Sequence, residues 1–371
     1  SPAMKEPMLM KLSVDGNTVK NVELRMGYTH KGIEKLLEGK NPDQAMYVAS
    51  RICGICSFSH ERAYIRAAET IARVNADERT KLVRMIVFEL ERISSHLLWA
   101  GYMMHEIGYD AMFQFLWRER EKVLDMTEDI CGNRIHKNIS KIGTLRYDVT
   151  PKQCEKLIEV LNGIDKKAKD YEKEIEKNSI VRERLSGVGV ITKRTAEEYA
   201  LVGPNARASG VNNDIRRIDP YDEYGKIVFD SVVLKDGDSM ARTLARMTEI
   251  GESIKIIKQS VALLPDDKIK PFALTQMKDG EGIGRVEAPR GELFYFLKFK
   301  NNVVERAKVR TPTFAYIKIL EQLLKDVEIG DVPVIIASLD PCFSCMERVM
   351  VAKNGREEWL TEKSFKEKFK C

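Results

Sequence analysis

Two short segments near opposite ends of the chain, RICGICSFSH (residues 51–60) and DPCFSCMER (residues 340–348), determine how the whole sequence folds. Each segment contains a Cys-x-x-Cys pair, and 286 positions separate the pairs (342 − 56). Two thiolates at this spacing can point at one ion, because a tight turn places both sulfurs about 2.3 Å from it. We therefore expect the fold to bring its two ends together, with both pairs holding one redox-active metal centre.

Two other kinds of site use Cys-x-x-Cys pairs. A structural zinc site usually joins pairs separated by about 15 to 20 residues, although longer intervals occur. A thioredoxin-like redox pair would use one pair and leave the other idle. Seven cysteines in 371 residues do not make a disulfide scaffold, and the paired spacing favours metal or redox chemistry in a reducing compartment. Zinc and a redox pair remain alternatives on spacing alone.

The flanking residues make the pattern more specific. Together the two segments resemble the two nickel-binding signatures of nickel-iron hydrogenase large subunits. The resemblance extends through most of the chain. It includes KGIE (residues 31–34), GPNARASG (residues 203–210) and EAPRG (residues 287–291).

One difference from the family pattern indicates which of its branches this chain resembles. Most of that family has His three positions after the last cysteine, where this sequence has Arg348. In this respect the chain resembles the energy-converting, membrane-bound hydrogenases of the Ech and formate-hydrogenlyase kind. These share ancestry with the 49-kDa-type subunit of respiratory complex I, which lacks the four cysteines. A chain that keeps all four is expected to activate hydrogen still.

The resemblance implies a role for each cysteine. Cys53 and Cys342 would be terminal nickel ligands, while Cys56 and Cys345 would bridge nickel to an iron that carries carbonyl and cyanide ligands. Soft thiolates suit both metals, and a small substrate needs an open coordination position. The implied reaction is the heterolytic splitting of hydrogen or its reverse.

Three other residues would assist the proton chemistry. By the resemblance Arg290 lies over the open face and Asp340 orients it. A guanidinium with a pKa above about 12 is too weak a base, so we expect Arg290 to polarise the substrate electrostatically and to hold it in position. A purely structural loop arginine is the alternative. Cys342 is the expected proton acceptor, and Glu6 stands where the family has its first proton-relay glutamate.

Further contacts with the cofactor are implied around this set. His60 is expected to bond a bridging sulfur, with a core histidine as the alternative. Thr313 would donate to a cyanide ligand, and Pro289 would line the cofactor site. In many relatives a glutamate at the position of Glu34 helps bind a second ion, such as Mg²⁺, together with the C-terminal His. Arg348 cannot ligate a cation, so a salt bridge of Glu34 is the alternative.

Apolar periodicity predicts a mainly α (α+β) fold, a long helical bundle with small peripheral β elements, as in the hydrogenase large subunits. Alternating apolar residues on both sides of Asp15-Gly16-Asn17 predict a β-hairpin. Residues 281–309 read as loop and strand, and the apolar run 332–339 as a buried strand. Helices are predicted from a cap at Asn75 through Leu97, and over residues 110–131, 151–177 and 239–264.

We expect one catalytic domain over residues 1–371. In relatives that mature by proteolysis, an endopeptidase removes everything after the position of Arg348, so the tail is a candidate propeptide, although an unprocessed enzyme is the alternative. Cys131 and Cys154 fall on predicted helices and are expected to be buried and inert, and Cys371 to be disordered. The parts of the domain are a hairpin with the first metal motif (1–74), a helical bundle (75–280), a loop with the second motif (281–348) and a tail (349–371).

Bulk properties set limits on partners. The formal charge of +5 arises from 61 basic and 56 acidic residues, and this near balance does not predict nucleic-acid binding. No apolar run approaches the roughly 20 residues that span a bilayer, so a soluble chain is expected. The first residues, Ser-Pro-Ala-Met, favour an N-terminus upstream of the printed sequence.

Taken together, these observations predict the catalytic large subunit of an energy-converting nickel-iron hydrogenase. Electrons would come from ferredoxin through a small subunit with a four-iron four-sulfur cluster, because this chain has no spare cysteine set. Membrane partners would pump ions, and the chain would lie peripherally on the cytoplasmic side of the cell membrane. The rival is a non-catalytic complex I-like scaffold whose cysteines hold zinc or nothing. A sulfur- or quinone-reducing relative would be expected to have lost one cysteine pair.

Overall fold

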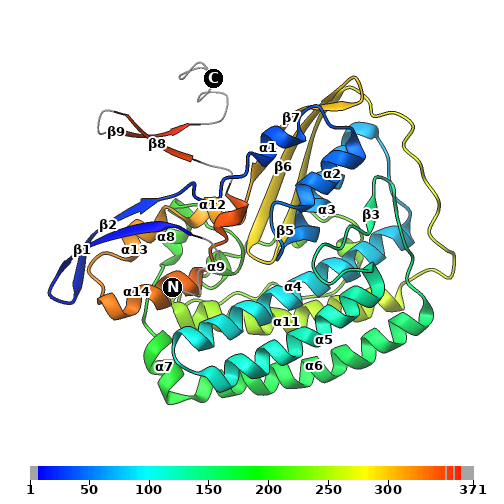
Figure 1. Ribbon diagram of the computed structural model, residues 1–371. Helices are drawn as coiled ribbons and strands as arrows, with labels where there is room; N and C mark the ends of the chain where they lie inside the picture. Colours follow the sequence, from blue (N-terminus) through cyan, green and yellow to red (C-terminus); the bar gives the residue numbers. More distant parts are fainter. Residues whose placement is uncertain (1–6, 347–348, 354–355, 361–371) are drawn as a thin grey trace.

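Four long helices run alongside one another in the computed structural model, which describes residues 7–346, 349–353 and 356–360. Figure 1 shows them as the lower part of the molecule, with a small sheet standing above them. The helices are α4 (Glu78–Glu106), α5 (Asp110–Cys131), α6 (Pro151–Lys177) and α11 (Ser239–Ala262).

The ends of these helices follow from their sequences. The Asp77 carboxylate accepts the Thr80 N–H and caps α4, and Asp238 caps α11 in the same way. Thr150 and Gln153 form a reciprocal capping box at the start of α6. Gly132, with a φ of 72°, ends α5 in the left-handed conformation that glycine adopts without strain.

The predicted helices are confirmed with small corrections. The boundaries of α5 and α6 are those predicted. Helix α4 is capped by Asp77 rather than Asn75 and continues past Leu97 to Glu106. Helix α11 ends at Ala262, two residues earlier than expected. Periodicity identifies a helix reliably, but the side chain that caps it is chosen by local geometry.

An antiparallel three-stranded sheet lies beside the bundle. Its strands, in the order β5-β6-β7, are β5 (Gly280–Ala288), β6 (Gly291–Lys300) and β7 (Val303–Arg310). Residues 281–309 were predicted as loop and strand, so the prediction missed a regular sheet. In β6 every second side chain is buried, which is the pattern of a strand with one face on the core.

Helix α3 (Ser57–Ala72) packs directly on β5, and two glycines permit the contact. A Cβ atom at Gly284 would lie 2.0 Å from the Ala63 carbonyl oxygen, and one at Gly282 would lie 2.6 Å from that of Ala67. Neither neighbour is a flexible side chain that can turn away. The close approach of helix to strand therefore requires glycine at both positions.

We expect Gly284→Ala to lower the free energy of unfolding by about 1–3 kcal/mol or more, because the added methyl group forces backbone atoms apart. Gly163→Ala is the matched control. Gly163 lies inside α6 with nothing within 4 Å of an added Cβ, so alanine there should stabilise by about 0.5–1 kcal/mol through helix propensity. Urea unfolding of the two variants checks the opposite signs. Equal effects would contradict the packing argument.

A β-hairpin and a short apolar helix form the other end of the molecule. The hairpin, β1 (Leu9–Asp15) and β2 (Thr18–Arg25), confirms the prediction. The predicted strand over residues 332–339 is wrong, because this run is helix α14 (Val332–Leu339). An apolar run of eight residues does not distinguish a buried strand from a buried helix. The proline in its first turn is the feature that favours the helix.

Shorter elements connect these parts. Those near the first cysteine motif are α1 (Ile33–Leu37), α2 (Pro42–Ser50), β3 (Ser140–Lys141) and β4 (Thr144–Leu145). Those between α6 and α11 are α7 (Ser179–Leu185), α8 (Lys193–Glu198), α9 (Gly203–Arg207), α10 (Ile215–Ile218) and the 3₁₀ turn η1 (Tyr224–Lys226). Those after the sheet are α12 (Pro312–Tyr316), α13 (Ile319–Leu323), η2 (Ile329–Asp331), η3 (Phe343–Cys345), β8 (Val349–Lys353) and β9 (Arg356–Leu360).

Two apolar clusters make up most of the core. The larger joins the long helices to α3 and the sheet, and it includes the four cysteines of the two motifs. The second surrounds the hairpin with α13 and α14, and it includes Phe343 and Met346. The second cysteine motif therefore lies where the clusters meet. No helix in the described ranges has both the length and the apolar character needed to cross a bilayer.

Candidate metal centre

The two Cys-x-x-Cys pairs meet in the interior, as the sequence predicted. The Sγ atoms of Cys53 and Cys342 are 3.5 Å apart, those of Cys56 and Cys345 3.7 Å, and those of Cys342 and Cys345 3.0 Å. All four side chains are at most 5% exposed. A disulfide bond measures about 2.05 Å, so none of these contacts is a disulfide. Four sulfurs from opposite ends of the chain thus share one buried position.

The first pair lies in the turn between α2 and α3, and Cys56 is the N-cap residue of α3. Glu91 of α4 holds this turn, because its carboxylate accepts the backbone N–H groups of Phe58 and Ser59 at 2.7 and 2.8 Å. The Nζ atom of Lys137 lies 2.9 Å from the same carboxylate and balances its charge. This buried ion pair, together with the two N–H groups that it binds, fixes the start of α3 and so the position of Cys56.

The second pair follows the C-terminus of α14. Asp340 takes the left-handed conformation there, with a φ of 53°, which turns the chain toward Cys342. The Cys342 N–H donates to the Thr313 hydroxyl at 2.9 Å, and the Tyr316 hydroxyl donates to the Asp340 carbonyl at 2.9 Å. Thr313 and Tyr316 also contact one another through their hydroxyls at 3.2 Å. Helix α12 thus holds the backbone that carries the cysteine.

Arg290 and Asp340 form the predicted contact. The Arg290 guanidinium reaches one Asp340 carboxylate oxygen at 2.8 Å and the Asp340 carbonyl at 3.1 Å. Both side chains are buried. Burial alone would lower the pKa of Arg290, but Asp340 and the thiols of Cys342, Cys56 and Cys53 raise it well above its usual range. Arg290 is therefore a permanent cation facing the sulfurs and serves no role as a base.

The turn that carries Pro289 and Arg290 joins β5 to β6 and is tightly held. A Cβ atom at Gly203 would lie 2.4 Å from the Arg290 carbonyl oxygen, so the α9 backbone packs against this turn. Arg92 donates to the carbonyls of Glu287 and Ala288 just before it. Pro289 itself is buried, which suits the predicted lining role without testing it.

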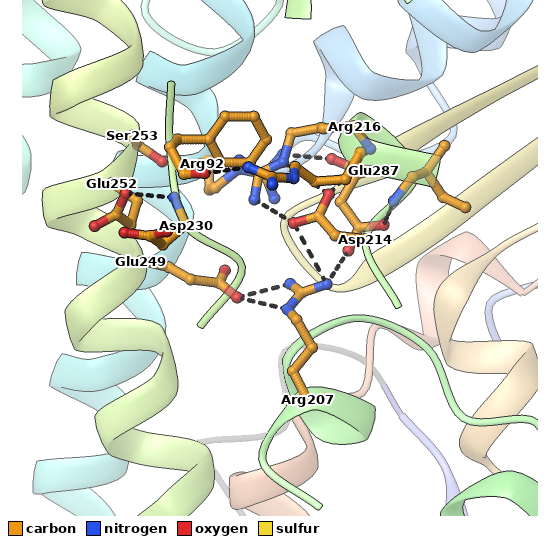
Figure 2. Close-up of polar contacts among 12 residues, drawn as sticks. Arg92, Arg207, Asp214, Arg216, Asp230, Glu249, Glu252, Ser253 and Glu287 are labelled. Atoms are coloured by element: carbon orange, nitrogen blue, oxygen red, sulfur yellow. Dashed lines mark hydrogen bonds and ion pairs between the residues drawn. The ribbon is translucent and has the colours of Figure 1, made fainter. Parts of the chain in front are cut away.

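A network of buried charges supports the same turn from the bundle side. Figure 2 shows Arg207 between two carboxylates, those of Glu249 on α11 and Glu287 on β5. The two N···O distances are 2.6 and 2.7 Å. Arg216 and Asp214 form a second pair beside them, at 2.7 Å. Removing one partner of such a buried pair typically costs 3–5 kcal/mol, so the network strongly constrains how β5 meets the helices.

Lys31 connects the two cysteine loops, and the sequence analysis gave it no role. Its Nζ atom donates to the Ile52 carbonyl at 2.8 Å and to the Ser344 carbonyl at 3.1 Å. One side chain thus ties the backbone before Cys53 to the backbone before Cys345. The only signal in the sequence was the resemblance of residues 31–34, which marks the stretch but not the contact.

We expect Lys31→Met to weaken metal retention about tenfold, because hydrogen bonds to a charged group contribute roughly 1.5–3 kcal/mol. The measurement is the metal that remains bound to the purified protein during chelator challenge. Lys169→Met is the matched control, since this exposed lysine on α6 contacts Asp165. Equal loss in both variants would show that Lys31 does not hold the loops together.

His60 lies behind the first pair, where the sequence placed it. Its Nδ1 atom contacts the Tyr295 hydroxyl at 2.8 Å, and its Nε2 atom is buried without a hydrogen-bond partner among the described residues. The predicted bond to a sulfur is therefore not formed here. Burial lowers the pKa of His60 to about 4, so the ring is neutral at physiological pH. A neutral imidazole can still donate one N–H to a group bound at the thiols.

The thiols cannot all ionise without a cation. Hydrogen bonds from Cys342, Cys345 and Cys56 lower the pKa of Cys53 well below its usual range. The pKa of Cys345 is raised because its thiol is hydrogen-bonded to Cys342, Cys53 and Cys56 and is buried. For Cys56 a hydrogen bond from Cys345 lowers the pKa, but the bond to Cys53 and burial outweigh it and the pKa rises. Only a bound metal would allow full deprotonation.

The residues at this site fit a thiolate-held metal group. The donor set is entirely sulfur, which soft transition metals prefer. Two buried polar atoms near the thiols, Nε2 of His60 and Oδ2 of Asp340, have no hydrogen-bond partner within the described part of the chain. Buried polar atoms are normally satisfied, so these two are available to a bound group.

The other predicted residues lie apart from the thiols. Glu34 accepts from the Lys308 ammonium and the Val309 N–H, both at 2.9 Å, which is the salt bridge given as its alternative. Cys131 is buried as expected, whereas Cys154 is only half-buried, because it lies on the outer part of α6. The remaining predicted residues, Glu6, Arg348 and Cys371, fall outside the described residues.

Comparison with known proteins places this arrangement among respiratory and hydrogenase complexes. The sequence profile described as "Respiratory-chain NADH dehydrogenase, 49 Kd subunit" matches residues 106–275 and 272–348. The membrane-bound hydrogenase subunit alpha of Pyrococcus furiosus is 37% identical, over 98% of this chain and 89% of its own. The carbon monoxide-induced hydrogenase of Rhodospirillum rubrum is 33% identical, over 93% and 96%.

A solved structure is similar as well. A chain from the membrane-bound sulfane sulfur reductase, an archaeal respiratory membrane complex, superposes with a TM-score of 0.88 at 30% identity. The match covers 93% of this chain and 96% of that one. The mainly helical fold with small antiparallel sheets is therefore shared along nearly the whole length.

Proposed function

This chain belongs to the family of the 49-kDa subunit of the respiratory-chain NADH dehydrogenase, together with the hydrogenase subunits similar to it, and we propose that it is the catalytic large subunit of an energy-converting nickel-iron hydrogenase. The proposed reaction is the reversible formation of H₂ from two protons and two electrons. The electrons come from ferredoxin through a small subunit that carries a four-iron four-sulfur cluster. Membrane partners couple the reaction to ion translocation.

The convergence of four buried thiols is the observation that carries this proposal. A scaffold with an empty site or a quinone-reducing subunit has no use for four sulfurs within 3.0–3.7 Å of their neighbours in the interior, and a scaffold with structural zinc is separated by metal analysis. The relatives include a sulfane sulfur reductase, so family membership alone does not select the reaction. The intact pairs Cys53/Cys56 and Cys342/Cys345 favour hydrogen chemistry over that relative's.

Each residue at the site has a proposed task. The four cysteines would hold a nickel-iron group, and by the resemblance Cys53 and Cys342 would be its terminal ligands and Cys56 and Cys345 its bridging ligands. When bound, that group, with its carbonyl and cyanide ligands on iron, supplies an open coordination position at which H₂ forms or splits. The Cys342 sulfur accepts or returns the proton, because it lies close to the buried pair of Arg290 and Asp340.

The residues around the four cysteines position the ligands and polarise the site. Arg290 supplies fixed positive charge over the sulfurs, and Asp340 holds its guanidinium in place. His60 donates its Nε2–H toward a ligand sulfur, and Thr313 positions Cys342 through its N–H. Glu6 is the proposed next proton carrier. Hydrogen formation at the wild-type rate in Glu6→Gln would remove it from the relay.

Metal analysis combined with infrared spectroscopy tests the proposal. The complex should be purified from cells that contain the maturation machinery, because the group must be inserted. Nickel and iron at one each per chain, with carbonyl and cyanide stretching bands, are the expected result. Stoichiometric zinc without those bands would overturn it and favour the non-catalytic complex I-like scaffold, the second function that the family description allows. Full metal loading without hydrogen turnover would favour the sulfur-reducing relative's chemistry.

We further propose a peripheral place for the chain on the cytoplasmic side of a membrane complex. The named relatives are a membrane-bound hydrogenase subunit and a chain of a respiratory membrane complex. Residues 349–371 are a proposed propeptide that an endopeptidase removes after metal insertion. The start of this tail forms strand β8, which pairs with β9. Intact-mass measurement of the nickel-loaded subunit decides: a full-length mass would refute cleavage.

A further inference from the structure

Three buried carboxyl groups lie on or beside helix α3: Glu61 and Glu69 belong to the helix, and Glu91 belongs to α4. Only two of them have a cationic partner. Glu91 lies 2.9 Å from the Lys137 ammonium, and Glu69 lies 2.8 Å from the Arg84 guanidinium. Glu61 is fully buried and has no ion pair within the described ranges. Its Oε1 atom accepts one hydrogen bond, from the Ser140 N–H at 2.8 Å. Glu61 therefore differs from its two neighbours in the way its charge would be balanced.

The second oxygen of Glu61 lies among other polar atoms that have no partner. Oε2 of Glu61, the Ser140 hydroxyl and Nε of Arg146 are all buried without a hydrogen-bond partner among the described residues. The hydroxyl of Ser140 lies in range of the carboxyl group, beside the N–H that already binds it. Buried polar atoms are normally paired, so three such atoms in one place require an explanation.

A proton on Oε2 of Glu61 supplies that explanation. An ionised carboxylate buried with one hydrogen bond is strongly disfavoured, whereas the neutral acid is not. The acid O–H would donate to the Ser140 hydroxyl while the Ser140 N–H donates to Oε1. One residue would then satisfy both oxygens of a carboxylic acid. We propose that Glu61 is a proton-binding site, neutral when the protein is at rest, which exchanges its proton with the solvent cavity beside α2.

The net effect of its surroundings favours the protonated form of Glu61. Burial raises the pKa of Glu61 to about 7; the Ser140 N–H and the nearby Ser140 hydroxyl oppose that rise, Glu91 adds to it and Arg146 opposes it. Burial raises the pKa of the nearby Cys131 thiol at the end of α5; Lys137 opposes that rise, and Glu61 and Glu91 add to it. Arg146 is the nearest uncommitted cation, and it is only half-buried, which limits its effect.

A cavity lies beside the residues that Arg146 and Ser140 adjoin. The Arg146 guanidinium stacks over the Tyr47 ring, 4.7 Å from the centroid. Tyr47 and Lys141, the residue after Ser140, line a cavity of about 390 Å³ between α2 and residues 272–275. Ser140 and Arg146, which lie beside Glu61, are thus adjacent to residues that line a cavity able to hold water. The inference does not depend on which metal the four thiols hold, because no cysteine of either motif takes part.

Infrared spectroscopy of the full chain in its complex is the direct test. The wild-type protein should show a protonated carboxylic-acid carbonyl band below neutral pH that disappears with a midpoint near 7. Glu61→Gln should lack this band. Glu69→Gln is the matched control, because it removes a paired carboxylate of the same helix and should leave the band unchanged. A wild-type band that is absent at every pH, or one that persists in Glu61→Gln, would overturn the proposal.

Thermal stability gives an independent measurement. The pKa of Glu61 is raised on folding from about 4.5 to about 7, so its contribution to stability is present below 4.5 and is lost as pH rises through 7. The melting temperature of the wild type should therefore fall between these values relative to Glu61→Gln. If Glu61→Gln does not fold, the infrared measurement can be made on Ser140→Ala instead. Losing the hydroxyl removes the acceptor of the acid O–H and should therefore shift both the frequency of the acid carbonyl band and its midpoint. A band unchanged in both respects would contradict the proposed pairing.

Discussion

Cys342→Ser is expected to lower hydrogen formation by at least about 10³-fold and to leave the purified subunit without stoichiometric nickel. A serine hydroxyl is a hard donor that stays protonated near neutral pH, whereas the metal requires a soft thiolate. The variant also removes the sulfur that lies 3.0 Å from Cys345 and 3.5 Å from Cys53, so both pairs lose a neighbour. Elemental analysis and hydrogen evolution with a reduced dye measure the two effects together.

Cys154→Ser is the control for this experiment. Its thiol is half-buried on α6 and takes no part in the cluster, so nickel content and rate should remain at the wild-type level. Nickel retention with substantial activity in Cys342→Ser would show that three thiols suffice. The assignment of Cys342 as a terminal ligand and proton acceptor would then be wrong.

Arg290→Lys is expected to slow hydrogen formation by about 10²–10³-fold while nickel and iron contents stay near one per chain. Removing a preorganised donor beside the reacting atoms typically has this effect. Lysine keeps the charge but loses the planar fork that reaches both the carboxylate and the carbonyl of Asp340. Asp340→Asn should resemble it, because the buried guanidinium then lacks its counter-charge.

The matched control is Arg62→Lys. Arg62 is an equally buried arginine, but it is paired with Asp222 at 2.7 Å rather than with a residue of the cysteine loops. It should lose stability without losing rate per nickel. If Arg290→Lys instead lost its metal together with its rate, the role of Arg290 would be structural, as a loop arginine.

Periodicity and motif spacing predicted much of this structure. The hairpin and the four long helices follow from local patterns, since caps such as Thr150 with Gln153 are formed within a few residues. The meeting of the cysteine pairs followed from metal chemistry, which demands four donors at one point. These features share one property: each is specified by residues that are close in sequence or by the needs of a single ligand.

Contacts that depend on tertiary packing were not predictable in the same way. Glu91 holds the start of α3 from 33 positions away, and Lys31 reaches Ser344 across 313 positions. Nothing local distinguishes these from surface charges. The helix α14 was predicted as a strand because its run is almost wholly apolar and six of its eight residues are buried, so no polar face reveals the period.

The distance in sequence between the two halves of the site bears on how the protein is made. Cys342 and Cys345 leave the ribosome nearly 290 residues after Cys53, so no nascent chain short of the last motif can assemble four sulfurs. Contacts of such long separation form late in folding, since a large loop must close first. Acquisition of the metal would thus report that translation has passed the second motif and that the two apolar clusters have docked. A truncated or misfolded subunit would stay without metal and be distinguishable from a finished one before it joins its partners.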